Sequence, residues 1–119
     1  MEKEIIINGK TYIEKGSEPV KNKDGLEYCI VRTCSAGVFA GWYDRSSVSK
    51  VGTVYDARRL WYWEGAASLS QLALEGVKKP DKCKFPAEVS EISLTEIIEV
   101  LPCTKEAKNS IAGVAVWRM

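Results

Sequence analysis

The sequence of 119 residues contains no histidine. Catalytic pairs of serine or cysteine with an imidazole base therefore cannot form, and mixed cysteine–histidine zinc sites are excluded. The four cysteines lack C-x-x-C spacing, and we expect them to be buried, reduced thiols. No Walker phosphate loop and no G-x-G-x-x-G motif occurs. These absences predict a protein that is not an enzyme and that has no metal site and no cofactor.

The chain also lacks a long apolar run and a charge imbalance. No segment approaches the ~20 apolar residues of a membrane span, and the N-terminus, MEKEIIINGK, has charges where a signal peptide has its apolar centre. The 17 basic and 16 acidic residues leave a net charge of +1, too small to hold a long nucleic acid or an acidic membrane. We therefore expect a cytoplasmic protein in which any anion site is local.

The turn formers divide the chain into three parts. Residues 1–16 contain two strand-like runs joined by Asn8-Gly9, which is typical of a two-residue hairpin turn. Residues 17–25 are polar and rich in turn formers, which predicts a loop. A chain of this length fits one compact domain, so we assign residues 26–119 to a single α+β domain.

Within that domain the patterns predict an antiparallel meander and two short helices. Strand-like runs at 26–33, 38–44 and 53–63 follow one another, with a turn at Ser35-Ala36-Gly37 between the first two. A helix is expected near residues 68–75, because Ser68 stands at capping-box spacing from Gln71 and Gly76 follows as a terminator.

The C-terminal third predicts further strands around a second helix. The alternation between residues 88 and 103 changes phase at Glu96-Ile97, which indicates either a bulge or two successive strands. The second helix is expected to begin at the N-cap Thr104 and to end at Gly113. A last strand is expected over residues 114–119.

The segment RRLWYWEGAAS, residues 58–68, combines guanidinium groups, aromatic rings and small residues. If the strand continues to residue 63, its side chains alternate between two faces, each with a guanidinium and a ring. One face then holds Arg59, Trp61 and Trp63, and the other holds Arg58, Leu60 and Tyr62. A strand with this composition is expected to border a ligand cleft or another chain.

The same segment predicts a site for a phosphorylated nucleotide. Rings stack on bases, arginines match phosphate oxygens, and the free N–H groups of a helix beginning at Ser68 favour anions. A second cluster, VKKPDKCKF, adds four lysines and a ring. The candidate ligand-binding residues are Arg58, Arg59, Trp61, Trp63, Ser68 and Phe85. The alternatives are core packing for the tryptophans, ion pairs for the arginines and a solvated loop for the lysines. The carboxylate of Glu64 argues against a phosphate nearby.

About three quarters of the chain resembles a family of small bacteriophage and prophage proteins. The blocks that carry the resemblance are YCIVRTCSAGVFAGW, ARRLWYWEGAASLSQLALEGVKKPDKCKFP, EIIEVLPCT and SIAGVAVW. The chain is also similar to the Thoeris anti-defence sponges, phage proteins that bind a cyclic ADP-ribose isomer, and in some cases cyclic oligonucleotides, and withhold it from the host's defence effector.

The resemblance implies a homo-oligomer in the bacterial cytoplasm with pockets between subunits, where arginines hold phosphates and a ring holds the adenine. Arg58, Arg59, Trp61 and Phe85 are the candidates for these roles. The alternatives are a phage protein that inhibits a host protein by direct binding, or a virion accessory protein, because exposed aromatic residues and arginines also form interface hot spots.

Overall fold

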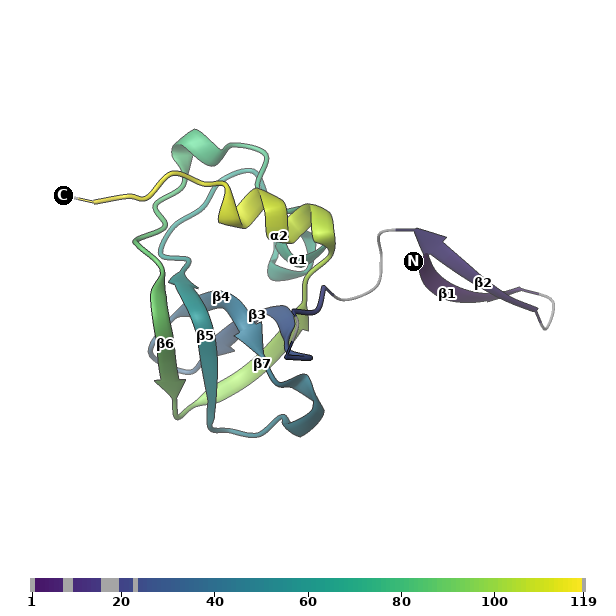
Figure 1. The fold of residues 1–119 in the computed structure, drawn as a ribbon. Coiled ribbons are helices and arrows are strands. Elements are labelled where there is room, and N and C mark those ends of the chain that lie inside the picture. The colour runs from purple at the N-terminus through teal and green to yellow at the C-terminus, as the bar shows by residue number, and fades with distance from the viewer. Residues whose placement is uncertain (1, 8–9, 16–19, 23, 119) are drawn as a thin grey trace.

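The computed structural model (Figure 1) describes residues 2–7, 10–15, 20–22 and 24–118. Strands β1 (Glu2–Ile7) and β2 (Lys10–Lys15) pair antiparallel as a separate two-stranded sheet, which confirms the N-terminal hairpin. The Asn8-Gly9 turn and part of the loop expected at 17–25 lie outside the described residues.

The main sheet begins with the predicted meander. Strands β3 (Glu27–Thr33), β4 (Val38–Tyr43) and β5 (Gly52–Arg59) pair in sequence order. Strand β6 (Val89–Leu94) adds to β5, and β7 (Ile97–Pro102) pairs with β3 at the other side. The resulting antiparallel order is β6-β5-β4-β3-β7. Two short 3₁₀ helices, Arg45–Ser47 and Pro80–Lys82, lie in the connections.

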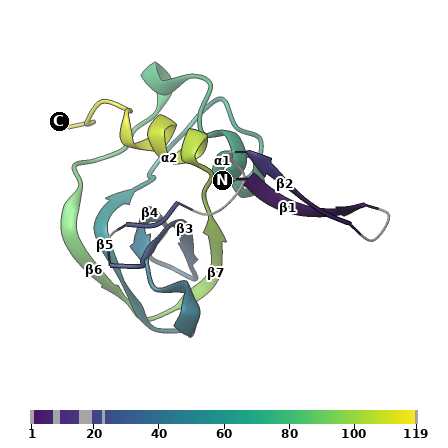
Figure 2. The same ribbon diagram turned by 45° about the vertical axis from the view of Figure 1, so that its right-hand side comes forward.

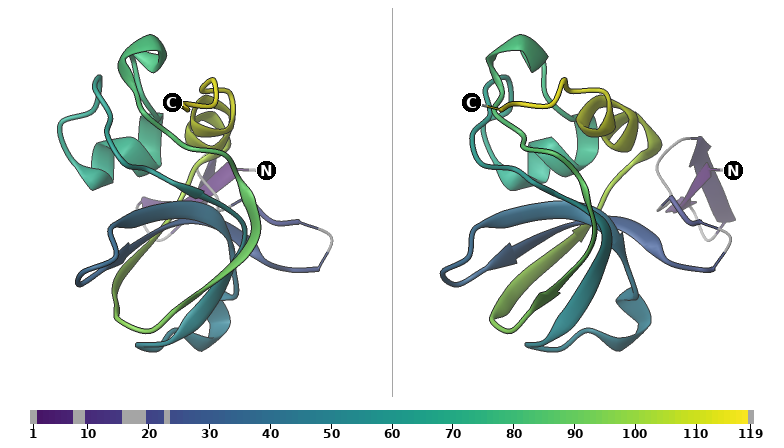
Figure 3. Two further views of the ribbon diagram at one scale, coloured as in Figure 1. Left: turned by 90° about the vertical axis from the view of Figure 1, so that its left-hand side faces the viewer. Right: turned by 60° about the vertical axis from the view of Figure 1, so that its left-hand side comes forward.

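The sheet is strongly curled, because its two edge strands are neighbours in the sequence. Only Thr95 and Glu96 separate the end of β6 from the start of β7. Three peptide steps span at most about 11 Å, whereas the edges of a flat five-stranded sheet lie roughly 19 Å apart. The edges must therefore approach each other, and Figure 3 shows the sheet rolled into a nearly closed barrel. The phase change at Glu96-Ile97 marks this junction between two strands.

The two faces of the curled sheet bury two different apolar clusters. Cys29 and Val31 belong to a cluster made only of strand residues, which fills the inside of the curl. The alternate residues Tyr28 and Ile30 belong to a second cluster that includes residues of both helices, such as Leu72. The alternation of side chains along β3 thus contributes to both cores.

Both predicted helices are present and lie side by side over one end of the sheet (Figure 2). Helix α1 (Leu69–Glu75) is capped by Ser68, whose hydroxyl accepts from the Gln71 N–H at 3.1 Å. Helix α2 (Lys105–Ala112) is capped by Thr104. These caps satisfy N–H groups that a helix start leaves without an intrahelical partner.

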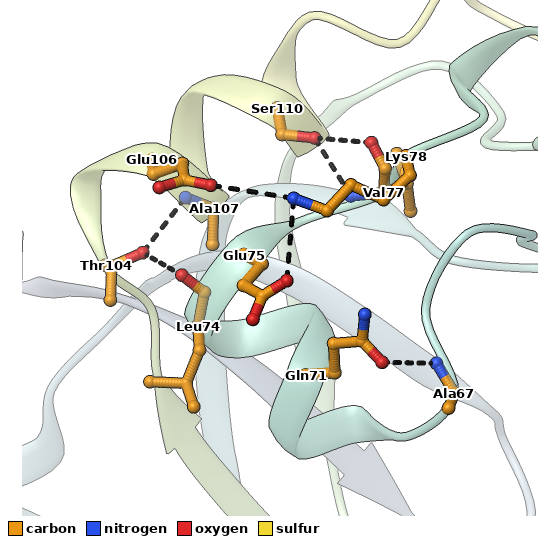
Figure 4. Close-up of polar contacts among 10 residues, drawn as sticks. All are labelled: Ala67, Gln71, Leu74, Glu75, Val77, Lys78, Thr104, Glu106, Ala107 and Ser110. Atoms are coloured by element: carbon orange, nitrogen blue, oxygen red, sulfur yellow. Dashed lines mark hydrogen bonds and ion pairs between the residues drawn. The ribbon is translucent and has the colours of Figure 1, made fainter.

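Polar contacts between the helices hold this layer together (Figure 4). The Thr104 hydroxyl donates to the carbonyl of Leu74 at 2.7 Å, and the Ser110 hydroxyl accepts from the N–H of Val77 at 3.0 Å. The Lys78 ammonium lies 3.9 Å from the Glu106 carboxylate of α2, but both side chains are more than half exposed, so this ion pair contributes little.

Two of the expected strands are wrong in extent. Strand β5 ends at Arg59 rather than at residue 63, because its partner β4 begins at Val38 and offers no residue opposite Trp61. Beyond Leu60 the chain leaves the sheet, and Tyr62 pairs with Lys84 instead. The expected strand at 114–119 is reduced, within the described residues, to one bridge between Val116 and Phe85.

A β-bulge interrupts the pairing of β4 with β5. Ala40 lies opposite Arg58 and Trp42 opposite Tyr55, so that two residues of β5 face Gly41 alone. One of them, Asp56, has a φ of +49°, which is uncommon for a residue other than glycine. A Cβ atom on Gly41 would lie 2.6 Å from Val54 Cγ1 and 2.7 Å from the carbonyl oxygen of Tyr55. The bulge therefore requires glycine at position 41.

Replacing Gly41 by alanine is expected to lower the free energy of unfolding by about 3 kcal/mol, because the new methyl group meets a backbone oxygen that cannot move aside. Urea denaturation measures the change. Gly25→Ala is the control: Gly25, unlike Gly41, has a positive φ, but a Cβ atom there meets open space, so the only cost is a conformational one of about 1 kcal/mol. Equal denaturation midpoints for the two variants would show that the bulge does not need a glycine partner.

Candidate functional site

A cavity of about 270 Å³ opens where the sheet meets α2 and the C-terminal segment. Its apolar part is formed by Ala112, Val114 and Val116. Its polar and aromatic lining comes from three strands, from α2 and from the segment before β6, and consists of Tyr28, Trp42, Asp56, Arg58, Glu88 and Lys108. Aromatic walls with a few convergent polar groups are typical of small-molecule sites.

Arg58 is buried in the wall of this cavity, with 6% of its surface exposed. Its Nε donates to the carbonyl of Pro86 at 3.1 Å, Nη1 to that of Ile111 at 3.0 Å, and Nη2 to that of Phe85 at 3.1 Å. The guanidinium thus joins β5 to the end of α2 and to the segment before β6. Burial lowers the pKa of Arg58, but a guanidinium remains charged at neutral pH.

The aromatic wall consists of Tyr28 and Trp42, which are directly opposite each other on β3 and β4. Their rings meet edge to face, with centroids 5.3 Å apart. The Lys108 ammonium lies 5.6 Å from the centroid of the Trp42 ring, a favourable cation–π distance. Burial, together with the negative charges of nearby groups such as Glu88, raises the pKa of the Tyr28 hydroxyl, which therefore stays protonated at neutral pH.

Two carboxylates complete the lining. Asp56 enters it from the bulge of β5, and Glu88 enters it from the segment before β6. With Arg58 and Lys108 they give the cavity two formal charges of each sign. A ligand that matches this lining needs both a negatively charged group and hydrogen-bond donors, because carboxylates only accept.

The six residues predicted from sequence do not form one site. Phe85 is fully buried in the core, and its ring centroid lies 5.5 Å from Arg58 Cζ. Trp63 is half-buried and packs against the same core. The Ser68 hydroxyl serves as the cap of α1. Arg59 is exposed; it donates to the Ala36 carbonyl and lies 4.5 Å from the centroid of the Phe39 ring. Of the predicted residues, only Arg58 lines the cavity.

Sequence reasoning missed the rest of the polar and aromatic lining: Tyr28, Trp42, Asp56, Glu88 and Lys108. One signal was available. A turn centred on Ser35, one residue before the centre of the expected turn, places Tyr28 opposite Trp42, and an aromatic pair on the hairpin could have been found with that register. The bulge and the approach of α2 have no comparable signature in the sequence.

Trp61 lies in a different place, with 58% of its surface exposed, so it is not a core residue. Its ring stacks on that of Trp117, with centroids 5.1 Å apart and planes 11° apart. The Lys84 ammonium lies 5.4 Å from the Trp61 ring, 5.7 Å from the Tyr62 ring and 5.8 Å from the Trp117 ring. We call these four residues the Trp61 cluster. The expected alternation of faces fails here, because Trp61 and Tyr62 are both exposed.

Three of the four free cysteines are buried as expected, and Cys34 is exposed, which corrects the expectation for that residue. Burial raises the pKa of Cys29 and of Cys103 to about 12 and also raises that of Cys83. These three groups are therefore neutral thiols at pH 8, and the thiolate is the reactive form.

The fold is that of an α+β protein with a curled five-stranded sheet and a cavity beside its second helix. The chain belongs to the DUF6948 family, a domain of unknown function, whose model matches residues 26–111. The match runs from the start of β3 into α2 and includes the polar and aromatic lining of the cavity. No curated protein and no solved structure matches the chain. Neither helix of the described part of the chain is long and apolar enough to cross a membrane.

Replacing Arg58 by methionine is expected to lower the free energy of unfolding by about 3–5 kcal/mol, because three carbonyls lose a charged donor. Arg59→Ala is the control and is expected to cost less than about 1 kcal/mol, since that side chain is exposed. Urea denaturation followed by tryptophan fluorescence measures both. Wild-type stability of Arg58→Met would contradict a structural role for Arg58.

A thiol-reactive chromophore at pH 8 is expected to label Cys34 rapidly and the other three cysteines only as the protein unfolds. Rapid labelling of all four cysteines in the native protein would show that the core is open.

The raised pKa values also predict that the free energy of unfolding falls at high pH. The stabilisation from keeping Cys29 and Cys103 neutral is complete below the ordinary thiol pKa of 9.0, and it is lost as the pH rises toward about 12.

Proposed function

We propose that this protein binds a small phosphorylated nucleotide without transforming it, in the cavity beside Arg58. In this proposal the ligand is a cyclic nucleotide immune signal, a cyclic ADP-ribose isomer or a cyclic oligonucleotide, which a phage protein sequesters in the bacterial cytoplasm. The observation that carries the proposal is the cavity itself, which combines two aromatic rings with two cations. The signal and its biological setting rest on the resemblance to the anti-defence sponges.

The size of the cavity supports a ligand that one subunit holds only in part. Pockets that enclose drug-sized ligands measure roughly 300–1,000 Å³, and this cavity has about 270 Å³. A base with its sugar fits such a volume, whereas a cyclic dinucleotide extends beyond it. A second copy of the chain would cover the remainder, and we therefore propose a homo-oligomer. Slow release, which sequestration requires, also favours enclosure by two subunits.

The proposal predicts that one or more members of a panel of cyclic ADP-ribose isomers and cyclic oligonucleotides will raise the melting temperature. A ligand at about 100 times its Kd stabilises the folded state by about 2.7 kcal/mol, which corresponds to several degrees. The matched variant is Ala112→Trp, which fills the cavity from the exposed end of α2 and leaves every charged residue in place. Binding that survives in Ala112→Trp would place the ligand elsewhere, and a panel without any effect would refute the proposal.

A second candidate function, inhibition of a host protein by direct binding, is favoured by the Trp61 cluster. Exposed tryptophan and tyrosine rings are typical of interface hot spots. Under this alternative, nucleotides leave the melting temperature unchanged, and Trp61→Ser breaks a complex with a defined host protein without affecting the stability of the chain.

A further inference from the structure

We infer that the cavity receives the nucleoside part of its ligand, that Asp56 and Glu88 recognise ribose hydroxyls, and that Lys108 rather than Arg58 holds the phosphate. The inference rests on the proposed function and names the ligand class more narrowly: a nucleotide that keeps a free ribose hydroxyl. It departs from the expectation, drawn from the sequence and the resemblance, that arginines hold the phosphate.

The Arg58 guanidinium already makes hydrogen bonds that stabilise the fold. Three of its five N–H groups, including the single N–H on Nε, donate to backbone carbonyls at 3.0 to 3.1 Å. Two of these bonds, to Phe85 and Ile111, are buried. Turning the guanidinium toward a phosphate would take the charged donor away from two buried carbonyls, which is costly. Arg58 therefore contributes a fixed positive charge to the wall but does not bind a phosphate in a bidentate manner.

The carboxylates determine which end of a nucleotide enters. Asp56 and Glu88 both line the cavity, and two negative charges would repel a phosphate placed among them. The same oxygens accept hydrogen bonds from vicinal hydroxyls or from amino groups. The rings of Tyr28 and Trp42 supply an apolar wall for a base. The polarity of the lining thus favours base and ribose inside and phosphate outside.

The bulge of β5 is the local structure that brings Asp56 into this lining. An uninterrupted antiparallel pair would place one residue of β5 opposite Gly41, whereas the structure places two there, with Asp56 at a φ of +49°. Bulges often re-aim a side chain beside a site, and an uncommon backbone conformation maintained by its surroundings is typical of functional positions. Asparagine tolerates the same conformation, so that Asp56→Asn removes the charge and keeps the bulge.

Lys108 is the cation that can reach a phosphate. It extends from α2 into the lining, and its ammonium lies 5.6 Å from the Trp42 ring centroid. No hydrogen bond or ion pair holds it among the residues that the structure describes. A lysine ammonium on a flexible stem can therefore turn from the ring to an anion at the mouth of the cavity.

The experiment compares four probes on the full chain: adenosine 5′-monophosphate, its 2′,3′-dideoxy analogue, adenosine and inorganic phosphate. Affinities come from calorimetry or, for weak binding, from the shift of the Trp42 indole N–H signal in NMR spectra. We expect the monophosphate to bind roughly tenfold more tightly than the dideoxy analogue. This ratio corresponds to the free energy of one hydrogen bond to a charged group. Inorganic phosphate is expected neither to bind in the cavity nor to compete with adenosine.

Two variants separate the roles. Asp56→Asn is expected to weaken the binding of the monophosphate roughly tenfold and to leave the affinity for the dideoxy analogue unchanged. Lys108→Gln is expected to weaken the binding of the monophosphate by a similar factor and to leave the affinity for adenosine unchanged. Lys105→Gln, on the same helix but outside the lining, is the matched control.

The outcomes distinguish this inference from the proposed function. Nucleotide binding that Asp56→Asn strengthens, or adenosine binding that inorganic phosphate competes with, would place the phosphate inside and overturn the inference alone. Binding of choline or an amino acid in preference to nucleotides would assign the carboxylates to a cationic ligand and overturn both. No binding of any nucleotide, including the panel of cyclic signals, would also overturn both.

Discussion

The short connection between β6 and β7 determines the shape of the whole sheet. Because two residues join strands that stand at opposite edges, the sheet must roll until those edges are near each other. The roll gives the sheet an inside that strand residues alone fill and an outside that the helices cover. A chain of this size therefore builds two apolar clusters from one sheet, and the cavity lies where the outer cluster ends.

Arg58 stabilises this arrangement from within the outer layer. A buried arginine is usually expected to pair with a carboxylate, yet here its hydrogen bonds go to carbonyls of three residues from two segments. One of these carbonyls, that of Ile111, belongs to the last turn of α2, where carbonyls lack intrahelical partners and a cation is favourable. The guanidinium fixes the position of α2 over the sheet, and with it the position of Lys108.

The candidate site depends on irregular features of an otherwise regular sheet. Asp56 enters the lining through a bulge that Gly41 permits, and Glu88 enters it just before β6 begins. The Trp61 cluster likewise exists because β5 ends where β4 has no further residue to pair. Both candidate surfaces therefore arise where strand pairing is interrupted, and neither repeats a pattern that periodicity alone would reveal.

The sequence by itself determined the local structure: the meander of β3 to β5, both helices with their Ser68 and Thr104 caps, and the break at Glu96-Ile97. Each depends on neighbours within a few residues, such as a turn former or a capping hydroxyl. Only the tertiary structure decided which side chains meet. Arg58 and Arg59 are adjacent in sequence, yet one is buried against carbonyls and the other is exposed on the surface. The physical reason is that burial depends on how α2 and the rolled sheet pack, and these contacts join residues more than 50 positions apart in the chain.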